Sequence, residues 1–365
     1  MAAVAIAVSF FVIIVAVAVS SGFRHTVRGG VAAMVGDVRI TPFLSGDAEP
    51  ESMPWHLPSE KAIEALPAVK EIVPAVVRAG IVKNGDIVHG VMVKGVPGKD
   101  LPSLSASIPK RLSEITGLGA GDDLTVYFVG EKVRVRKFHI VRVHRDLVEL
   151  DDNLLVYTSL EDMQRLNGWS EDQVSCLDIL TRNGRTEEVA LTIGNLLLGS
   201  GAPEEENLYV SASSGTYPQV FDWLGLLDFN VVIILVLMTV VAGFNMVSGL
   251  LIMLLRNVST IGTLKTLGMD NRSVGRLFVR IGAEAVLKGM LAGNALALLF
   301  CLIQGTTHLI PLDPANYFVS WVPVHVHLPW ILLADAAAFL GILALLWLPA
   351  RVVARIDPAT TVKAD

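Results

Sequence analysis

The most regular spacing in this chain belongs to a short segment that directly follows its most apolar run. Apolar residues recur there at every third position, as on one face of a short amphipathic helix, and a glycine follows as the expected C-cap. We assign to this coupling segment Val258, Ile261, Gly262, Leu264, Lys265, Leu267 and Gly268. Its chemistry is noncovalent. Because the preceding run is long enough to cross a membrane, a protein docked on the segment could push on a membrane helix.

Catalytic signatures are absent from the sequence. Gly98-Lys99-Asp100 comes nearest to a phosphate-binding loop, but Val93 stands where that loop needs a glycine, and no Ser or Thr follows the lysine. Gly-x-Ser-x-Gly, His-Glu-x-x-His and Cys-x-x-Cys do not occur. We therefore expect no enzymatic activity, no catalytic residue and no cofactor in this chain.

Two histidines, His325 and His327, are separated by one residue and would lie on one face of an extended segment. Imidazole is a common zinc ligand, but the further ligands at hand, His308 and Asp313, are distant in the sequence. We therefore expect a polar, solvated loop rather than a metal site.

The most basic run is 134–145. A nucleic-acid interface is one interpretation. The favoured one is a strand with its basic side chains in solvent and Val133, Val135 and Phe138 packed inward, since the segment lies in a block that we place outside the cytoplasm.

A few polar residues fall within or beside apolar runs. Asp335 is a functional candidate because carboxylates inside membranes are costly, but its shallow depth favours a structural role, hydrated or paired with a backbone group. Asn245 and Ser248 lie among small residues and are expected at a close helix–helix contact. Glu284 and Lys288 are four residues apart and are expected to form an ion pair.

Composition favours a membrane protein. Hydrophobic residues make up 52% and charged residues 18% of the 365 residues, and the mean hydropathy is +0.57, whereas about a quarter of a soluble domain is charged. The net charge of −6 gives no reason to expect a nucleic-acid partner. Of the two cysteines, Cys301 falls inside a predicted span and Cys176 does not, so no disulfide is expected.

Four apolar runs are long enough for membrane spans, which need ~20 residues. The fold class is therefore a multi-pass α-helical membrane protein with a large mixed α/β extracytoplasmic domain between the first two helices. The predicted segments are transmembrane helix 1 (1–23), the extracytoplasmic domain (24–228), transmembrane helix 2 (229–255), a cytoplasmic coupling helix and loop (256–280), transmembrane helix 3 (281–305), a short extracytoplasmic loop (306–328), transmembrane helix 4 (329–350) and a cytoplasmic tail (351–365).

The first apolar run, 2–19, is interpreted as a retained anchor, because it is longer than the apolar region of a signal peptide. Ser20-Ser21-Gly22 nevertheless resembles a cleavage site. No basic segment precedes the run, from which we expect the natural chain to begin further upstream.

Positive charge sets the predicted orientation. Lys and Arg accumulate on the cytoplasmic side of short loops, and the loop 306–328 has none. The loop between the second and third spans contains Arg256, Lys265, Arg272, Arg276, Arg280 and Lys288. This loop and the C-terminus are therefore predicted to be cytoplasmic, which places 24–228 outside, although Arg24 and Arg28 directly follow the first span.

The block 24–228 has the pattern of a mixed α/β domain. Alternating β-branched residues predict strands at 37–41, 79–82, 87–93, 124–129 and 132–143. Helices are predicted at 59–66, where Ser59 could cap, at 159–166, with Glu161 and Asp162 in the first turn, and at 186–197. The segment 42–58 is predicted to be a mobile loop and 199–206 a linker.

Several runs resemble the FtsX-like permeases of ABC transporters, in particular the MacB/LolC/LolE group and its lipoprotein-releasing LolC/LolE-type subunits. The most specific are 242–248 (AGFNMVS) and 261–269 (IGTLKTLGM); 357–363 (DPATTVK), 166–169 (LNGW) and 90–95 (GVMVKG) also match. The resemblance covers nearly the whole chain. The sequence lacks the family's basic segment before the first span, and Val258, Ser259 and Thr260 stand where family members often carry charges.

The resemblance implies a permease of the bacterial inner membrane with its large domain in the periplasm. Two permease subunits, identical or paralogous, would assemble with two copies of a cytoplasmic ATP-binding subunit docked on the coupling segment. Nucleotide-driven movement of the first two spans, a mechanotransmission, would release lipoproteins to a periplasmic lipoprotein carrier. Candidates for helix packing or for lining an apolar substrate cavity in contact with membrane lipid are Phe10, Phe11, Phe244, Asn245, Met246 and Ser248.

Two other functions remain open at this point. The same machine could drive MacB-like export or FtsX-like control of a cell-wall hydrolase. A membrane-anchored receptor without transport belongs to a different class, and in that case the coupling segment would bind no ATPase.

Overall fold

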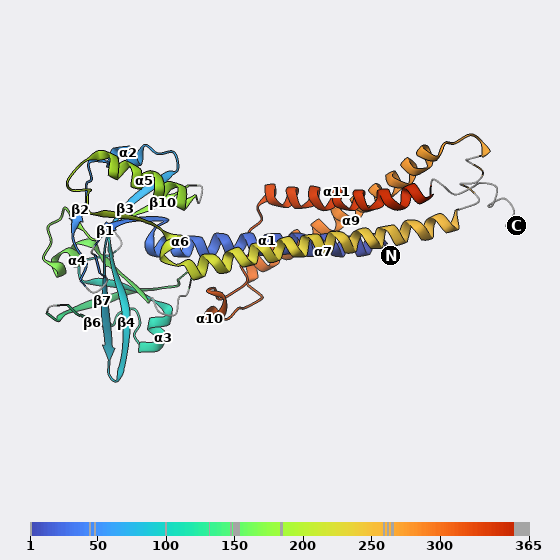
Figure 1. Ribbon diagram of the computed structural model, residues 1–365. Helices are drawn as coiled ribbons and strands as arrows, with labels where there is room; N and C mark the ends of the chain where they lie inside the picture. Colours follow the sequence, from blue (N-terminus) through green and yellow to red (C-terminus); the bar gives the residue numbers. More distant parts are fainter. Residues whose placement is uncertain are drawn as a thin grey trace. The chain divides into compact units, whose positions relative to one another are not determined.

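The computed structural model describes residues 2–43, 45–46, 49–98, 101–130, 132–146, 148, 154–182, 185–257, 260, 263 and 266–353. The chain divides into two compact units (Figure 1). The helical unit consists of Met1–His25, Asp222–Leu312 and Trp321–Asp365, and the sheet unit of Thr26–Phe221 and Asp313–Ser320. Two long helices, α1 and α7, contribute residues to both units.

The helical unit is built from four long helices of the described chain. These are α1 (Ala2–Val35), α7 (Pro218–Arg256), α9 (Asn271–Thr307) and α11 (Leu328–Val353). Each contains a stretch long and apolar enough to cross a membrane. Hydropathy alone therefore located all four of them.

Three of these helices extend well beyond the predicted spans. α1 ends at Val35 rather than near residue 23, α7 begins at Pro218 rather than at 229, and α9 begins at Asn271 rather than at 281. The added turns contain charged residues such as Arg24 and Arg28. A helix is maintained by its backbone hydrogen bonds, so it continues after the apolar run that defines a span has ended.

Side chains from all four helices form one buried core in the helical unit. It contains Ile6, Phe10, Ile13, Ile14, Ala242, Met246, Leu250, Val274, Phe278, Val286, Ala297, Ile331, Ala334, Ala338, Ile342 and Leu346. The spacing of the α11 members, three or four residues apart, marks one face of that helix.

The main sheet of the sheet unit has the strand order β11-β1-β10-β3-β4-β8-β5-β7-β6. Its strands are β1 (Val38–Pro42), β3 (Val69–Asn84), β4 (Ile87–Val96), β5 (Ser105–Pro109), β6 (Asp123–Phe128), β7 (Arg134–His144), β8 (Leu155–Ser159), β10 (Cys176–Thr181) and β11 (Leu208–Ala212). A further pairing of β3 with β6 joins β3-β4-β8-β5-β7-β6 into a closed ring. Gly80 permits this closure, because a Cβ there would lie 2.6 Å from Val126 Cγ1.

Strands β1 and β11 are neighbours although they are far apart in sequence. They pair antiparallel with Val38 opposite Ala212. β1 follows α1 after a short turn, and β11 leads through α6 (Ser213–Thr216) into α7. Both connections to the long helices therefore leave from adjacent strands of one sheet.

The predicted strands and helices of this unit are largely confirmed, and the corrections concern one helix, one helix cap, two segments expected to be irregular and the facing of β7. Helices α2 (Glu60–Glu64), α4 (Leu160–Asn167) and α5 (Thr186–Ser200) coincide with the predicted ones, and α3 (Lys110–Thr116) was not predicted. The Ser159 side chain caps α4 by accepting from the Asp162 amide. Ser59 makes no such cap; its hydroxyl donates instead to the buried Glu205.

Two segments that were expected to be irregular, 42–58 and 199–206, contain residues with long-range partners. The expected loop 42–58 contains β2 (Met53–Pro54), which pairs with β9 (Gln173–Val174). In the expected linker 199–206, Glu205 accepts hydrogen bonds from both the amide and the hydroxyl of Ser59, each 2.8 Å long. Polar composition suggested loops, but residues distant in the sequence pair with Met53–Pro54 and with Glu205.

The predicted basic, solvent-exposed strand is confirmed as β7, but two of the three residues expected to pack inward are exposed. Phe138 and Ile140 are buried, whereas Val133 and Val135 are 63% and 45% exposed. Residues 134–137 are all exposed, so both faces of this first part of the strand meet solvent. Buried and exposed side chains therefore begin to alternate only at Phe138.

This correction yields a stability prediction. Phe138→Ala should lower the free energy of unfolding by about 3–5 kcal/mol, because it leaves a cavity in the sheet core. The measurement is the labelling rate of the buried Cys176 thiol in rising urea, in a Cys301→Ala background. Val133→Ala is the matched control and should change the unfolding free energy by no more than about 0.5 kcal/mol. Equal effects of the two changes would contradict the assigned facing of β7.

Candidate functional site

Most of the coupling segment lies outside the described residues. This applies to Val258, Ile261, Gly262, Leu264 and Lys265. The described positions 260, 263 and 266 are helical, and Leu267 is 79% exposed. Gly268 has φ +96°, a left-handed conformation that suits the expected glycine cap. The docking role of the segment stays a prediction.

The segment is bounded on both sides by well-defined helix ends. α7 ends at Arg256, and α9 begins after Asp270, whose carboxylate accepts a hydrogen bond of 3.1 Å from the Ser273 amide. Such an N-cap fixes where α9 starts. Few residues therefore separate the coupling segment from the two long helices.

The candidate lining residues divide into a buried and an outward group. Phe10 and Met246 are buried in the four-helix core. Phe11 is half-buried, with its ring 6.0 Å from that of Phe300. Phe244 is 65% exposed.

The outward group continues on α7. Asn245 and Ser248 are exposed together with Phe244. Only 6% of the most apolar window of α7 is buried, against 33% for that of α1. Helix α7 thus presents a face, with an amide and a hydroxyl among apolar side chains, that the described part of the chain does not cover.

A pair of glycines on α9 holds α1 close, and the sequence reading missed it. At Gly293 a Cβ would lie 2.5 Å from the Ala7 carbonyl oxygen, and at Gly289 2.6 Å from Ile6 Cγ2. The spacing Gly-x-x-x-Gly within an apolar run is the signal that could have found this contact, because small residues let two helices approach closely.

Asp335 has a side-chain partner rather than the expected backbone or water. It is buried, and the Asn294 Nδ2 donates to its Oδ2 over 2.6 Å. The other oxygen of each group, Asn294 Oδ1 and Asp335 Oδ1, is buried without a partner. The pair joins α9 to α11 and supports the structural role that was favoured for Asp335.

Charged residues also connect α1 with α7. Arg24 forms an ion pair with Asp228, and the Ser20 hydroxyl donates to the same carboxylate over 2.8 Å. This ion pair gives a partner to Arg24, the basic residue directly after the first apolar run. The predicted ion pair of Glu284 and Lys288 is confirmed at 2.8 Å.

The loop before α11 packs on α1 through histidines. The His325 and His25 rings stack with centroids 4.7 Å apart, and the His327 ring lies 6.2 Å from that of His325. The His325 amide donates to the Ala18 carbonyl over 3.0 Å. Among the described residues, no cluster of three His, Cys, Asp or Glu side chains has the arrangement of a metal site.

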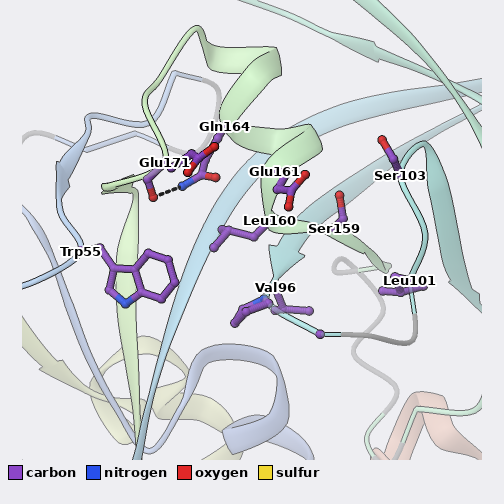
Figure 2. A pocket seen from close by; sticks show the side chains of 11 residues that line it. Trp55, Val96, Leu101, Ser103, Ser159, Leu160, Glu161, Gln164 and Glu171 are labelled. Atoms are coloured by element: carbon purple, nitrogen blue, oxygen red, sulfur yellow. Dashed lines mark hydrogen bonds between the residues drawn. The ribbon is translucent and has the colours of Figure 1, made fainter.

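A recess of about 430 Å³ opens in the sheet unit. Figure 2 shows the Trp55 indole on one side and Leu160 and Val96 on the other. One wall is fixed by the buried Gln164, whose amide donates to the Glu171 carbonyl over 2.9 Å. The lining of this recess is mixed, with the polar side chains of Ser103, Glu161 and Gln164 beside the apolar ones.

Comparison with known proteins assigns the helical part of the chain. Residues 232–358 match the family model of the FtsX-like permease C-terminal region. This part of the chain is an FtsX-like permease domain. The match includes α7, the coupling segment, α9 and α11, and it confirms the resemblance seen in the sequence.

Two relatives are lipoprotein-releasing system transmembrane proteins. The chain is 34% identical to LolE of Haemophilus influenzae over 136 aligned residues. This alignment covers 35% of this chain and only 32% of LolE. The chain is 22% identical over 401 residues to LolC of Xylella fastidiosa strain 9a5c, which covers 98% of this chain and 92% of LolC. The chain therefore spans about a third of the first relative and nearly all of the second.

Two solved structures are weakly similar. The periplasmic region of MacB from Actinobacillus actinomycetemcomitans has a TM-score of 0.34 at 11% identity, covering 52% of this chain and 95% of that one. The extracellular domain of YknZ from Gram-positive bacteria has a TM-score of 0.31 at 11% identity, covering 48% and 98%.

The close glycine contact yields a packing prediction. Gly293→Ala should force α1 away from α9, because the added Cβ meets backbone that cannot yield, and should lower stability by about 1–3 kcal/mol. Thermal unfolding in detergent measures this loss. Gly225→Ala on α7 is the control, since a Cβ there meets nothing within 4 Å. A Gly293→Ala protein as stable as this control would contradict the assigned packing.

The histidine contact predicts a dependence on pH. Burial, with the charges of His25 and His327, lowers the pKa of His325 below its usual 6.5. The unfolded chain then takes up a proton before the folded one does, so stability should fall as the pH drops below 6.5. His325→Gln should reduce this fall in melting temperature between pH 7 and 5. The exposed His56→Gln should not, and a slope unchanged by His325→Gln would contradict the assignment.

Proposed function

We propose that this chain is a permease subunit of an ATP-driven ABC transporter that releases lipoproteins from the inner membrane to a periplasmic carrier. The observation that carries the proposal is the FtsX-like permease match over 232–358 together with similarity to LolC along almost the full chain. The sheet unit would then lie in the periplasm, and the coupling segment in the cytoplasm.

The partners follow from two surfaces. A separate ATP-binding subunit docks on the coupling segment, which supplies an apolar face and Lys265 between two long helices. A second permease subunit, a copy or a paralogue, covers the outward face of α7. An exposed amide such as that of Asn245 in hydrocarbon is stabilised by a hydrogen-bonding partner, and a second helix provides one.

The energy of ATP is needed because the cargo is apolar. Each acyl CH₂ moved from hydrocarbon into water costs about 0.8 kcal/mol. A lipoprotein therefore leaves the bilayer only if the permease shields its acyl chains from water and ATP hydrolysis supplies the energy. In this proposal the exposed Phe244 and the half-buried Phe11 contact such chains, whereas Phe10 and Met246 would reach them only when the helix core opens.

Two alternatives are distinguished by experiment. A permease of the same type that exports another cargo, or that controls a hydrolase, would keep its ATPase but leave lipoproteins correctly sorted. A receptor without transport would have no ATPase bound to the coupling segment.

The test is a pair of variants in that segment. Leu264→Asp and Lys265→Glu should each abolish co-purification of the ATP-binding subunit and leave mature lipoproteins in the inner membrane. The measurements are pull-down of the complex and membrane fractionation.

Leu309→Asp is the control, because Leu309 is 72% exposed in the loop 306–328 on the other predicted side. It should leave both readouts unchanged. Retained binding in both coupling variants would refute the docking role. Normal lipoprotein sorting after depletion of the protein would refute the cargo.

A further inference from the structure

The last turn of α1 is held by buried side chains of the sheet. The Lys94 ammonium on β4 donates to the Met34 carbonyl over 2.9 Å, and the Arg39 guanidinium on β1 donates to the same oxygen over 3.3 Å. The Met34 carbonyl is one of the last carbonyls of α1, which have no partner within the helix. Two cations at a helix C-terminus also interact favourably with the helix dipole.

A single carboxylate holds both cations. Asp178 on β10 receives two hydrogen bonds from Arg39, of 2.6 and 2.9 Å, and forms an ion pair of 2.7 Å with Lys94. The side chains of Lys94 and Asp178 are only 4% and 3% exposed. Burial raises the pKa of Asp178, but the charges of Arg39 and Lys94 outweigh it and hold that pKa below its usual value. The carboxylate is therefore charged at neutral pH.

Gly36 brings the helix end into this position. It has φ +72°, and its amide donates to the Ala32 carbonyl over 2.8 Å, which is the glycine-capped end of a helix. A Cβ at this residue would lie 3.0 Å from Asp178 Cβ. The turn thus sets the end of α1 directly against β10.

The same sheet edge also receives the connection to α7. β1 lies between β11 and β10 in the sheet. The Ser213 amide at the start of α6 donates to the Asp37 carbonyl over 2.9 Å, and Asp37 accepts from the Thr181 amide of β10 over 2.7 Å. The strands that continue into both long helices are therefore joined beside the buried ions.

We propose that Lys94, Asp178 and Arg39 are positioning residues that fix the end of α1 to strands β1, β4 and β10, so that a displacement of α1 moves the sheet instead of fraying the helix end. The inference deepens the proposed function, because it specifies where movement driven from the coupling segment enters the sheet unit. These residues contact neither nucleotide nor cargo in this scheme.

The decisive variant is Lys94→Met. It removes the shorter of the two bonds to the Met34 carbonyl and leaves the neutral Arg39–Asp178 pair, so that no buried charge is left unpaired. Hydrogen exchange of the amides of residues 32–36, measured in the full complex, should accelerate at least tenfold. Lys94→Arg should restore protection. Lys110→Met, which removes an exposed lysine from the same unit, is the matched control.

The second measurement is lipoprotein released per ATP hydrolysed by the complex reconstituted in vesicles. Lys94→Met should lower this ratio severalfold while assembly and ATP hydrolysis persist. Unchanged exchange would refute the attachment, and an unchanged ratio despite faster exchange would refute its role in coupling. A wild-type complex that hydrolyses ATP without releasing lipoprotein would instead refute the proposed function, and the exchange result would still test the attachment.

Labelling of the buried Cys176 verifies that the variant is folded. If Lys94→Met exposes this thiol, Arg39→Lys replaces it, since it keeps the charge but loses the two-point contact with Asp178. That variant should accelerate exchange at residues 32–36 severalfold, and wild-type exchange would refute the attachment.

Discussion

The structure depends on one constraint: polar groups carried by or beside the apolar helices must find partners, since water is not available to all of them. Asp335 meets this constraint with Asn294, and Arg24 with Asp228. The end of α1 meets it with a buried ion cluster. Among the described residues, α7 presents Asn245 and Ser248 outward from an apolar face, which supports the second subunit proposed above.

The sequence predicted what depends on local pattern. Apolar runs located the four long helices, and alternation located strands such as β4 and β6. The helix predicted at 159–166 from the acidic residues of its first turn is α4, which spans Leu160–Asn167. The coupling segment was identified by spacing as well, but its docking role depends on a partner chain and stays a prediction.

What sequence reading missed depends on contacts between distant residues. Ser59 was expected to cap a helix, yet its hydroxyl donates to the distant Glu205. Asp178 was not singled out, because nothing near it in the sequence reveals Arg39 or Lys94 as partners. Gly289 and Gly293 were also missed, although their Gly-x-x-x-Gly spacing is visible in the sequence. Only the structure shows that the helix they contact is α1.

The ion cluster at the end of α1 is an unusual use of buried charge. Replacing a buried ion pair by apolar residues is often neutral or stabilising, so such a cluster is weak evidence of a need for stability alone. Its geometry is specific, however, because Asp178 binds both Arg39 and Lys94, and both of these donate to the Met34 carbonyl. An apolar contact in the same place would bury area but would let the helix end rotate or slide. Directed bonds to Met34 resist both movements, which is the property that a helix transmitting force requires.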